Sequence, residues 1–218
     1  MTLIIGAQCK GGVVLAADRR RIVRHEIGPD TNKLFKLDCG VALAGAGDDA
    51  VLNEARVFIE REVEKPRDQI FQMKLFDIVE ITIGVVNELV NCYRDKIEEP
   101  FGYALAALEN IDSGNAKLYT IFGAGFSNVP WACIGSGSSY ARPLVELLLA
   151  DGGLATDEAT KVVATIFTLV SNVQTTVSSD VDVCTIKDGE VTGEIQHFGD
   201  VDLNPLRVCI LNTIGIRA

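Results

Sequence analysis

The second residue of the chain, Thr2, would combine two chemically useful groups if Met1 were removed. A threonine hydroxyl is a weak nucleophile that needs a base within hydrogen-bond reach. A free α-amino group titrates at about 8, whereas a lysine side chain titrates at about 10.4. An N-terminal threonine therefore holds a nucleophile and a base suited to neutral pH on one Cα atom. An acylated nitrogen is not a base, so this chemistry requires loss of Met1. Met-Thr is a common start, and the rest of the chain must decide its meaning.

The composition is that of a globular protein with an excess of acidic groups. Of the 218 residues, 48% are hydrophobic and 23% are charged, so the chain can bury a substantial core, and we expect one domain over residues 1–218. The net charge of −10 argues against a nucleic-acid partner, because such binding needs clustered lysine and arginine. The short basic run from Arg19 to Arg21 lies among acidic residues, and we expect it to be a solvated loop.

Neither a metal site nor a membrane span is predicted. The six cysteines lack the short paired spacing of zinc ligands or redox pairs, and we expect them to behave as small apolar residues. The longest apolar stretch is interrupted by Asp77, Glu80 and Glu88, so it should not cross a bilayer. No signal peptide is recognisable, and a cytoplasmic location is expected. We accordingly expect no metal and no membrane partner.

Two β-hairpins are expected to open the fold. The runs "LIIGAQC" and "GVVLAAD" flank a Lys-Gly-Gly turn at residues 10–12, which is typical of a hairpin. The runs "KLFKL" and "GVALAGA" follow in the same way and flank a turn at residues 38–40. The first strand should therefore pair with the second, and the third with the fourth.

The apolar period then changes to that of helices. Residues 48–65 have one apolar face, whereas residues 69–96 are apolar around most of the circumference, which predicts a helix lying between other layers. Thr156 is the expected N-cap of a later helix. Further strands are predicted at residues 103–108, 115–122, 131–135, 181–186 and 191–198, and further helices at 140–152 and 156–173. Strands and helix pairs that alternate in such blocks predict an α+β sandwich of two stacked sheets between helix pairs.

Five segments in this order resemble the β subunits of the proteasome: "TLIIGAQCKGGVVLAADRR", "NKLFKL", "GVALAGAGDDA", "CIGSGSSYA" and "VDVCTIKDG". These subunits are N-terminal-threonine peptidases with the N-terminal-nucleophile hydrolase fold. The resemblance covers almost the whole chain, and only the residues from Val201 onward match no pattern. Because no helix precedes the first strand, the β type is expected rather than the gating α type. The Met-Thr start is also similar to the peptidase ring of the bacterial ATP-dependent two-component protease.

The resemblance implies a four-layer αββα sandwich and hydrolysis of peptide bonds through an acyl ester on Thr2, after removal of Met1. It also implies polypeptide substrates and assembly into a homo-oligomeric ring, single or stacked, with an ATPase or an α-type ring as a partner. No metal or cofactor is implied.

The resemblance also assigns residues around Thr2. Lys33 stands at the essential lysine, where its charge would lower the pKa of the Thr2 amine and stabilise the developing alkoxide. Asp18, sixteen residues after Thr2, matches the acidic partner of that lysine. Lys36 is expected to be an ordinary surface lysine.

Further positions concern the substrate and the amine. Gly45 would present its backbone N–H to the oxyanion, and Gly47 would line the pocket for the substrate side chain. Ser136 matches the serine that hydrogen-bonds the N-terminal amine. Ser138 is the close alternative for this role. These serines could instead have a purely structural role, with Ser138 or Ser139 capping the following helix.

The sequence departs from the family in its last motif. Ser178 or Ser179 can stand for the late serine, but the aspartate expected three residues earlier is replaced by Thr175 or a neighbour, and the following glycines are missing. The two-component branch also lacks that acid. A catalytically silent ring subunit therefore remains an alternative, as does an N-terminal-nucleophile transpeptidase or amidase.

Overall fold

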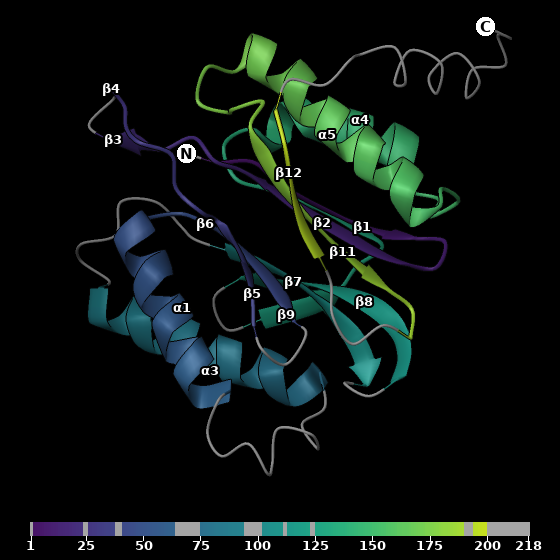
Figure 1. The fold of residues 1–218 in the computed structure, drawn as a ribbon. Coiled ribbons are helices and arrows are strands. Elements are labelled where there is room, and N and C mark those ends of the chain that lie inside the picture. Colours follow the sequence, from purple (N-terminus) through teal and green to yellow (C-terminus); the bar gives the residue numbers. More distant parts are fainter. Residues whose placement is uncertain are drawn as a thin grey trace, which may run out of the picture.

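The computed structural model describes residues 2–23, 26–37, 41–63, 75–93, 102–110, 113–122, 125–189 and 194–199. Two five-stranded sheets are stacked on each other, and a pair of helices covers the outer face of each (Figure 1). The predicted αββα sandwich is confirmed.

The first sheet contains the N-terminal hairpin at its centre. Its strand order is β10-β1-β2-β11-β12, and all of its neighbouring strands run antiparallel. The expected turn at residues 10–12 joins β1 to β2, as predicted. The strands are β1 (Ile4–Cys9), β2 (Gly12–Asp18), β10 (Trp131–Ile134), β11 (Val181–Lys187) and β12 (Glu194–Phe198).

The second sheet has the order β5-β6-β7-β8-β9 and is also antiparallel. The second predicted hairpin is confirmed by the pairing of β5 with β6, although its turn lies outside the described residues. Strand β9 was not predicted, because its four residues, "GFSN", are all exposed and have no apolar period. The strands are β5 (Leu34–Lys36), β6 (Ala42–Ala46), β7 (Gly102–Asn110), β8 (Ser113–Phe122) and β9 (Gly125–Asn128). A small ribbon of β3 (Ile22–Val23) and β4 (Glu26–Ile27) follows β2.

The helix pairs form the outer layers (Figure 1). Helices α1 (Asp49–Val63) and α3 (Leu75–Tyr93) cover the second sheet, and α4 (Ser138–Leu149) and α5 (Thr156–Val173) cover the first. The expectation that the apolar helix α3 lies between other layers is wrong. Glu80, Gly84 and Glu88 are four residues apart and form an exposed stripe, so this helix keeps one face toward solvent. Thr156 is the first residue of α5, and Ala155, not Thr156, is its N-cap.

Successive side chains of the central hairpin, β1 and β2, point alternately into two different parts of the hydrophobic core. Ile4 of β1, with Val13 and Leu15 of β2, lies in the cluster between the two sheets. Ile5 and Val14 point the other way, into the cluster shared with α4 and α5. Successive side chains of a strand face opposite sides, so a strand buried on both faces must be apolar at every position. The continuous apolar runs of the sequence reflect this double burial.

The sheets are joined at the end of β1 that is remote from Thr2. There the Asp188 carboxylate accepts the N–H of Ala116 in β8 at 2.7 Å. The N–H of Asp188 donates to the carbonyl of Gly11 at 3.0 Å, and the N–H of Gly189 donates to the carbonyl of Gly114 at 3.0 Å. These bonds fix the turn after β11 against both sheets.

A bilayer-crossing helix is not found among the described residues, since every helix there is too short or too polar for that role.

Candidate active site

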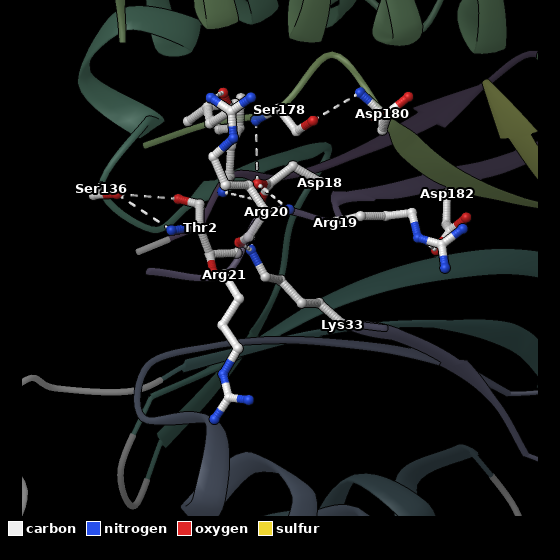
Figure 2. Close-up of polar contacts among 12 residues, drawn as sticks. Thr2, Asp18, Arg19, Arg20, Arg21, Lys33, Ser136, Ser178, Asp180 and Asp182 are labelled. Carbon is white, nitrogen blue, oxygen red and sulfur yellow. Dashed lines mark hydrogen bonds and ion pairs between the residues drawn. The ribbon is translucent and has the colours of Figure 1, made fainter. Parts of the chain in front are cut away.

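Five of the predicted site residues come together at one end of the central hairpin (Figure 2). The strand register explains why. Ile4 pairs with Ala17 and with Ile134, so the chain just before β1, the end of β2 and the segment after β10 are neighbours. Val181 pairs with Asp18, which places the segment before β11 beside them. The residues brought together are Thr2, Asp18, Lys33, Ser136 and Ser178.

A buried ion pair lies at the centre of this group. The Lys33 Nζ atom is 2.9 Å from Asp18 Oδ1, and the two side chains are 3% and 0% exposed. The same Oδ1 accepts the N–H of Leu3 at 2.9 Å, and Oδ2 accepts the N–H groups of Arg20 at 3.1 Å and Ser178 at 3.3 Å. Lys33 Nζ also donates to the Arg20 carbonyl at 2.5 Å. A buried charge is tolerated only with such partners, and the Asp18 carboxylate accepts four hydrogen bonds.

Burial changes the proton affinities of both groups. It lowers the pKa of the Lys33 ammonium below its ordinary value, although the carboxylates of Asp18, Asp49 and Asp30 oppose this shift. It raises the pKa of the Asp18 carboxyl, against the opposing effects of the Lys33 ammonium and of backbone N–H donors. Lys33 therefore holds its proton less tightly than an exposed lysine, within the group of residues that includes Thr2 (Figure 2).

Residues 135–137 lie against the main chain of Thr2. The Thr2 N–H donates to Ser136 Oγ at 3.2 Å, and the Thr2 carbonyl accepts the N–H of Gly137 at 3.2 Å. Gly135 has φ of +98°, and a Cβ atom there would lie 2.2 Å from the Thr2 carbonyl oxygen. Glycine is thus required at this position for both conformation and space. The sequence analysis missed Gly135, although it lies within the quoted motif "CIGSGSSYA".

The geometry separates the alternative serines. Ser136 contacts Thr2, whereas Ser138 is the first residue of α4, whose N-cap is Gly137 and which has no side-chain cap. Capping by Ser138 is therefore not observed. Ser178 is 4% exposed and contacts Asp18 through its backbone N–H, while its Oγ accepts the N–H of Asp180 at 3.1 Å. Ser179, the other candidate, is half-buried.

The expected role of Gly45 is contradicted by the structure. Its N–H donates to the Lys33 carbonyl at 3.1 Å, because Gly45 lies inside β6 and pairs with the segment that leads into β5. That N–H is not available to an oxyanion. Gly47 follows the end of β6 with φ of +142° and is half-buried. Its predicted place in a substrate pocket stays a prediction.

The basic run is not the solvated loop that we expected. Arg19 contacts Asp182 at 3.8 Å, and Arg21 contacts Asp49 at 2.7 Å. The Arg20 side chain contacts the segment before β11, where its Nη1 atom donates to the carbonyls of Thr175 at 2.7 Å and Val177 at 2.9 Å. Charge spacing in the sequence could not reveal these partners, because they lie far away along the chain.

Three of the described cysteines are poor competitors for the role of nucleophile, whereas Cys92 is exposed on α3. Burial raises the pKa of Cys133 to about 12 and those of Cys9 and Cys184 to about 11, so thiolate is scarce at neutral pH. Cys39 and Cys209 lie outside the described residues. Within the described part of the chain, no group of three or more His, Cys, Asp or Glu residues is arranged to hold a metal ion.

Comparison with known proteins places the chain in a family. The family model described as "Proteasome subunit" matches residues 2–186. The chain belongs to the proteasome subunit family. The proteasome subunit alpha of Methanocaldococcus jannaschii is 28% identical over 195 residues, which cover 87% of this chain and 71% of that protein. The proteasome subunit beta 1 of Thermococcus onnurineus is 47% identical over 47 residues, which cover 21% of this chain and 23% of that protein.

Solved structures of the proteasome-like protein Anbu share the fold. Anbu from Yersinia bercovieri, described as an ancestral beta-subunit, superposes with a TM-score of 0.78 at 14% identity, covering 98% of this chain and 94% of that one. The helical assembly of the Anbu complex from Pseudomonas aeruginosa gives a TM-score of 0.77 at 15% identity, with 98% and 93% covered. Proteasome-family membership is thus confirmed, whereas the relatives include both α and β subunits and do not distinguish the type.

Proposed function

We propose that this proteasome-family subunit is a β-type threonine endopeptidase, active once Met1 has been removed. The observation that supports this most strongly is the buried Asp18–Lys33 pair, in which Asp18 accepts the main-chain N–H of Leu3, the residue that follows Thr2. Burying an ion pair contributes little to stability compared with apolar packing, so its place beside a candidate nucleophile favours a chemical role.

The proposed reaction uses groups of the chain alone. The Thr2 hydroxyl attacks the carbonyl carbon of the scissile peptide bond, and its proton passes to the free Thr2 amine. That proton then goes to the departing amine, which leaves an acyl ester on Thr2. Water hydrolyses the ester and restores the hydroxyl. Ser136 Oγ, which lies 3.2 Å from the Thr2 nitrogen, orients the base, and the Lys33 charge keeps the amine neutral.

The oxyanion needs a backbone donor other than Gly45. We assign this role to the N–H of Gly47, which lies beyond the end of β6 and outside the ladder that occupies Gly45. Because glycine has no Cβ atom, the substrate carbonyl could approach the backbone closely at this position.

A catalytically silent subunit is the second candidate. The absence of an acid at Thr175 and the similarity to α subunits favour it. The cost of keeping a buried ion pair beside Thr2 opposes it. A transpeptidase or amidase would share the acyl ester and differ only in the acceptor or the substrate.

We also propose that the chain assembles through its helical layers into a closed homo-oligomeric ring in the cytoplasm, alone or stacked with a second ring. Exposed apolar side chains lie on both layers, including Tyr140 and Leu147 of α4 and Val57 and Phe58 of α1. Closed cyclic symmetry is the usual outcome for soluble homo-oligomers. Light scattering that shows a monomer at all concentrations would contradict the ring.

The decisive experiment begins with the intact mass of the purified protein, which shows whether Met1 is absent. A peptide epoxyketone should then add covalently to Thr2, and Thr2→Ala should abolish the adduct, while Lys36→Ala, which changes an exposed lysine, should not. Labelling that persists in Thr2→Ala, or that maps to a cysteine, refutes the mechanism. A wild type that lacks Met1 but neither labels nor cleaves a peptide library is instead the silent subunit.

A further inference from the structure

The segment between α5 and β11 lacks the acid that the family places there, yet it still reaches the ion pair. Residues 174–180 contain Thr175 where an aspartate was expected, and Ser178 in this segment donates its N–H to Asp18. A segment without regular structure needs contacts that hold it in place. Arg20 supplies such contacts.

Arg20 bonds to the site in three ways. Its main-chain N–H donates to Asp18 Oδ2 at 3.1 Å, and its main-chain carbonyl accepts a hydrogen bond from Lys33 Nζ. Its side chain extends in the opposite direction to Arg21 and donates from one nitrogen, Nη1, to the carbonyls of Thr175 and Val177 (Figure 2). One residue therefore connects both members of the ion pair with the segment whose Ser178 N–H bonds to Asp18.

We propose that Arg20 is a positioning residue for the reaction of Thr2, because its guanidinium holds residues 175–177 so that Ser178 can donate to Asp18. This inference rests on the proposed function. The charge-assisted hydrogen bonds of the guanidinium to two carbonyls perform the orienting work for which the missing aspartate was expected. The substrate is not contacted by Arg20, which acts through Ser178 and Asp18.

Loss of this contact should change the environment of the ion pair. If the 174–180 segment moves away, Asp18 loses the N–H of Ser178 and water gains access to the pair. The charged groups around Lys33 are Asp18 at the end of β2, Asp49 in α1 and Asp30 in the preceding loop. These would remain, while burial, the main cause of the lowered pKa of Lys33, would be reduced. The pKa of Lys33 should therefore rise toward its ordinary value.

The test compares Arg20→Met with Arg19→Met. Both changes remove a guanidinium and keep an unbranched side chain. The Arg19 side chain contacts Asp182 and Asn32, and its bond to the 174–180 segment comes from its main-chain N–H to the Asp180 carbonyl, which the substitution keeps. In Arg20→Met, amide hydrogen exchange in a peptide covering residues 174–180 should accelerate, and the rate of Thr2 labelling should fall about tenfold, the scale of one charge-assisted hydrogen bond. Arg19→Met should match the wild type in both measurements.

Arg20→Lys should restore part of the loss, because a single nitrogen serves both carbonyls and an ammonium can do the same. Unchanged exchange and labelling in Arg20→Met, or equal losses in the two methionine variants, would overturn the proposal. The pKa of Lys33 can also be measured by NMR titration in the wild type and in Arg20→Met, and this measurement does not depend on enzymatic activity. An unchanged pKa in Arg20→Met would count against the proposal. If the wild type does not label at all, the proposed function fails, while exchange and titration still decide whether Arg20 holds the segment.

Discussion

Lys33 and Asp18 form an ion pair 2.9 Å long from which solvent is almost entirely excluded. Asp18 ends β2 in the first sheet, whereas Lys33 directly precedes β5 in the second, so the pair spans the interface between the sheets. Because Asp18 is fully buried, no exposed cleft would hydrate its carboxylate after loss of Lys33. The pair must therefore be tested for stability as well as for chemistry.

Lys33→Ala should remove both activity and stability. We expect turnover to fall at least about a hundredfold, the scale of lost acid–base assistance. We also expect the free energy of unfolding to fall by about 3–5 kcal/mol, because an unpaired carboxylate remains buried. Lys36→Ala, on the exposed side of β5, is the matched control and should behave as the wild type in peptide hydrolysis and in thermal unfolding. Undiminished peptidase activity in Lys33→Ala would contradict the proposed role.

The rate of Thr2 labelling should fall at alkaline pH with a midpoint below the ordinary lysine value of about 10.4. Burial lowers the pKa of Lys33, and the ammonium is present below that pKa and is lost as pH rises through it. Asp49→Asn should move the midpoint to lower pH, because the Asp49 carboxylate raises the pKa of Lys33. Glu60→Gln, which changes the same helix near its other end, should leave the profile unchanged. A midpoint that moves upward in Asp49→Asn would exclude Lys33 as its source.

Gly135→Ala should displace Thr2 and abolish its labelling. The new Cβ would collide with the Thr2 carbonyl, and its backbone conformation would cost about 1–2 kcal/mol in addition. Gly11→Ala provides the comparison, because Gly11 has φ of +86° but open space around the site of a Cβ. Gly11→Ala should lose stability from backbone strain alone and should label normally. Equal labelling in the two variants would show that contact with Thr2 is unimportant.

Ser136→Ala removes the hydroxyl that accepts the Thr2 N–H, and it should slow labelling about tenfold. Ser136 is exposed, so thermal unfolding should change little. Ser138→Ala, two residues later, removes a hydroxyl that caps no helix and should leave the labelling rate as it is. A slower reaction in Ser138→Ala than in Ser136→Ala would reverse the assignment of the two serines.

The sequence predicted the layers and most of the site because both depend on local patterns. Continuous apolar runs such as residues 3–7 indicate strands buried on both faces, and the resemblance to proteasome β subunits implied that Asp18 and Ser136 lie near Thr2. Features that depend on long-range geometry were not predictable. The N–H of Gly45 is occupied because of strand pairing, and the partners of Arg20 lie 155 and 157 residues away along the chain.

The contacts that join the two sheets limit how a descendant of this chain could lose the proposed activity during evolution. At one end of the central hairpin, Asp188 joins the sheets through hydrogen bonds of its carboxylate and of its main-chain N–H, and the candidate site residues take no part in these bonds. At the other end, the Asp18–Lys33 pair joins the sheets and also has the chemical role that we propose for it. A descendant released from selection for catalysis would lose part of its folding free energy if either residue drifted alone. Inactive descendants should therefore either retain the pair or replace both residues together with apolar ones.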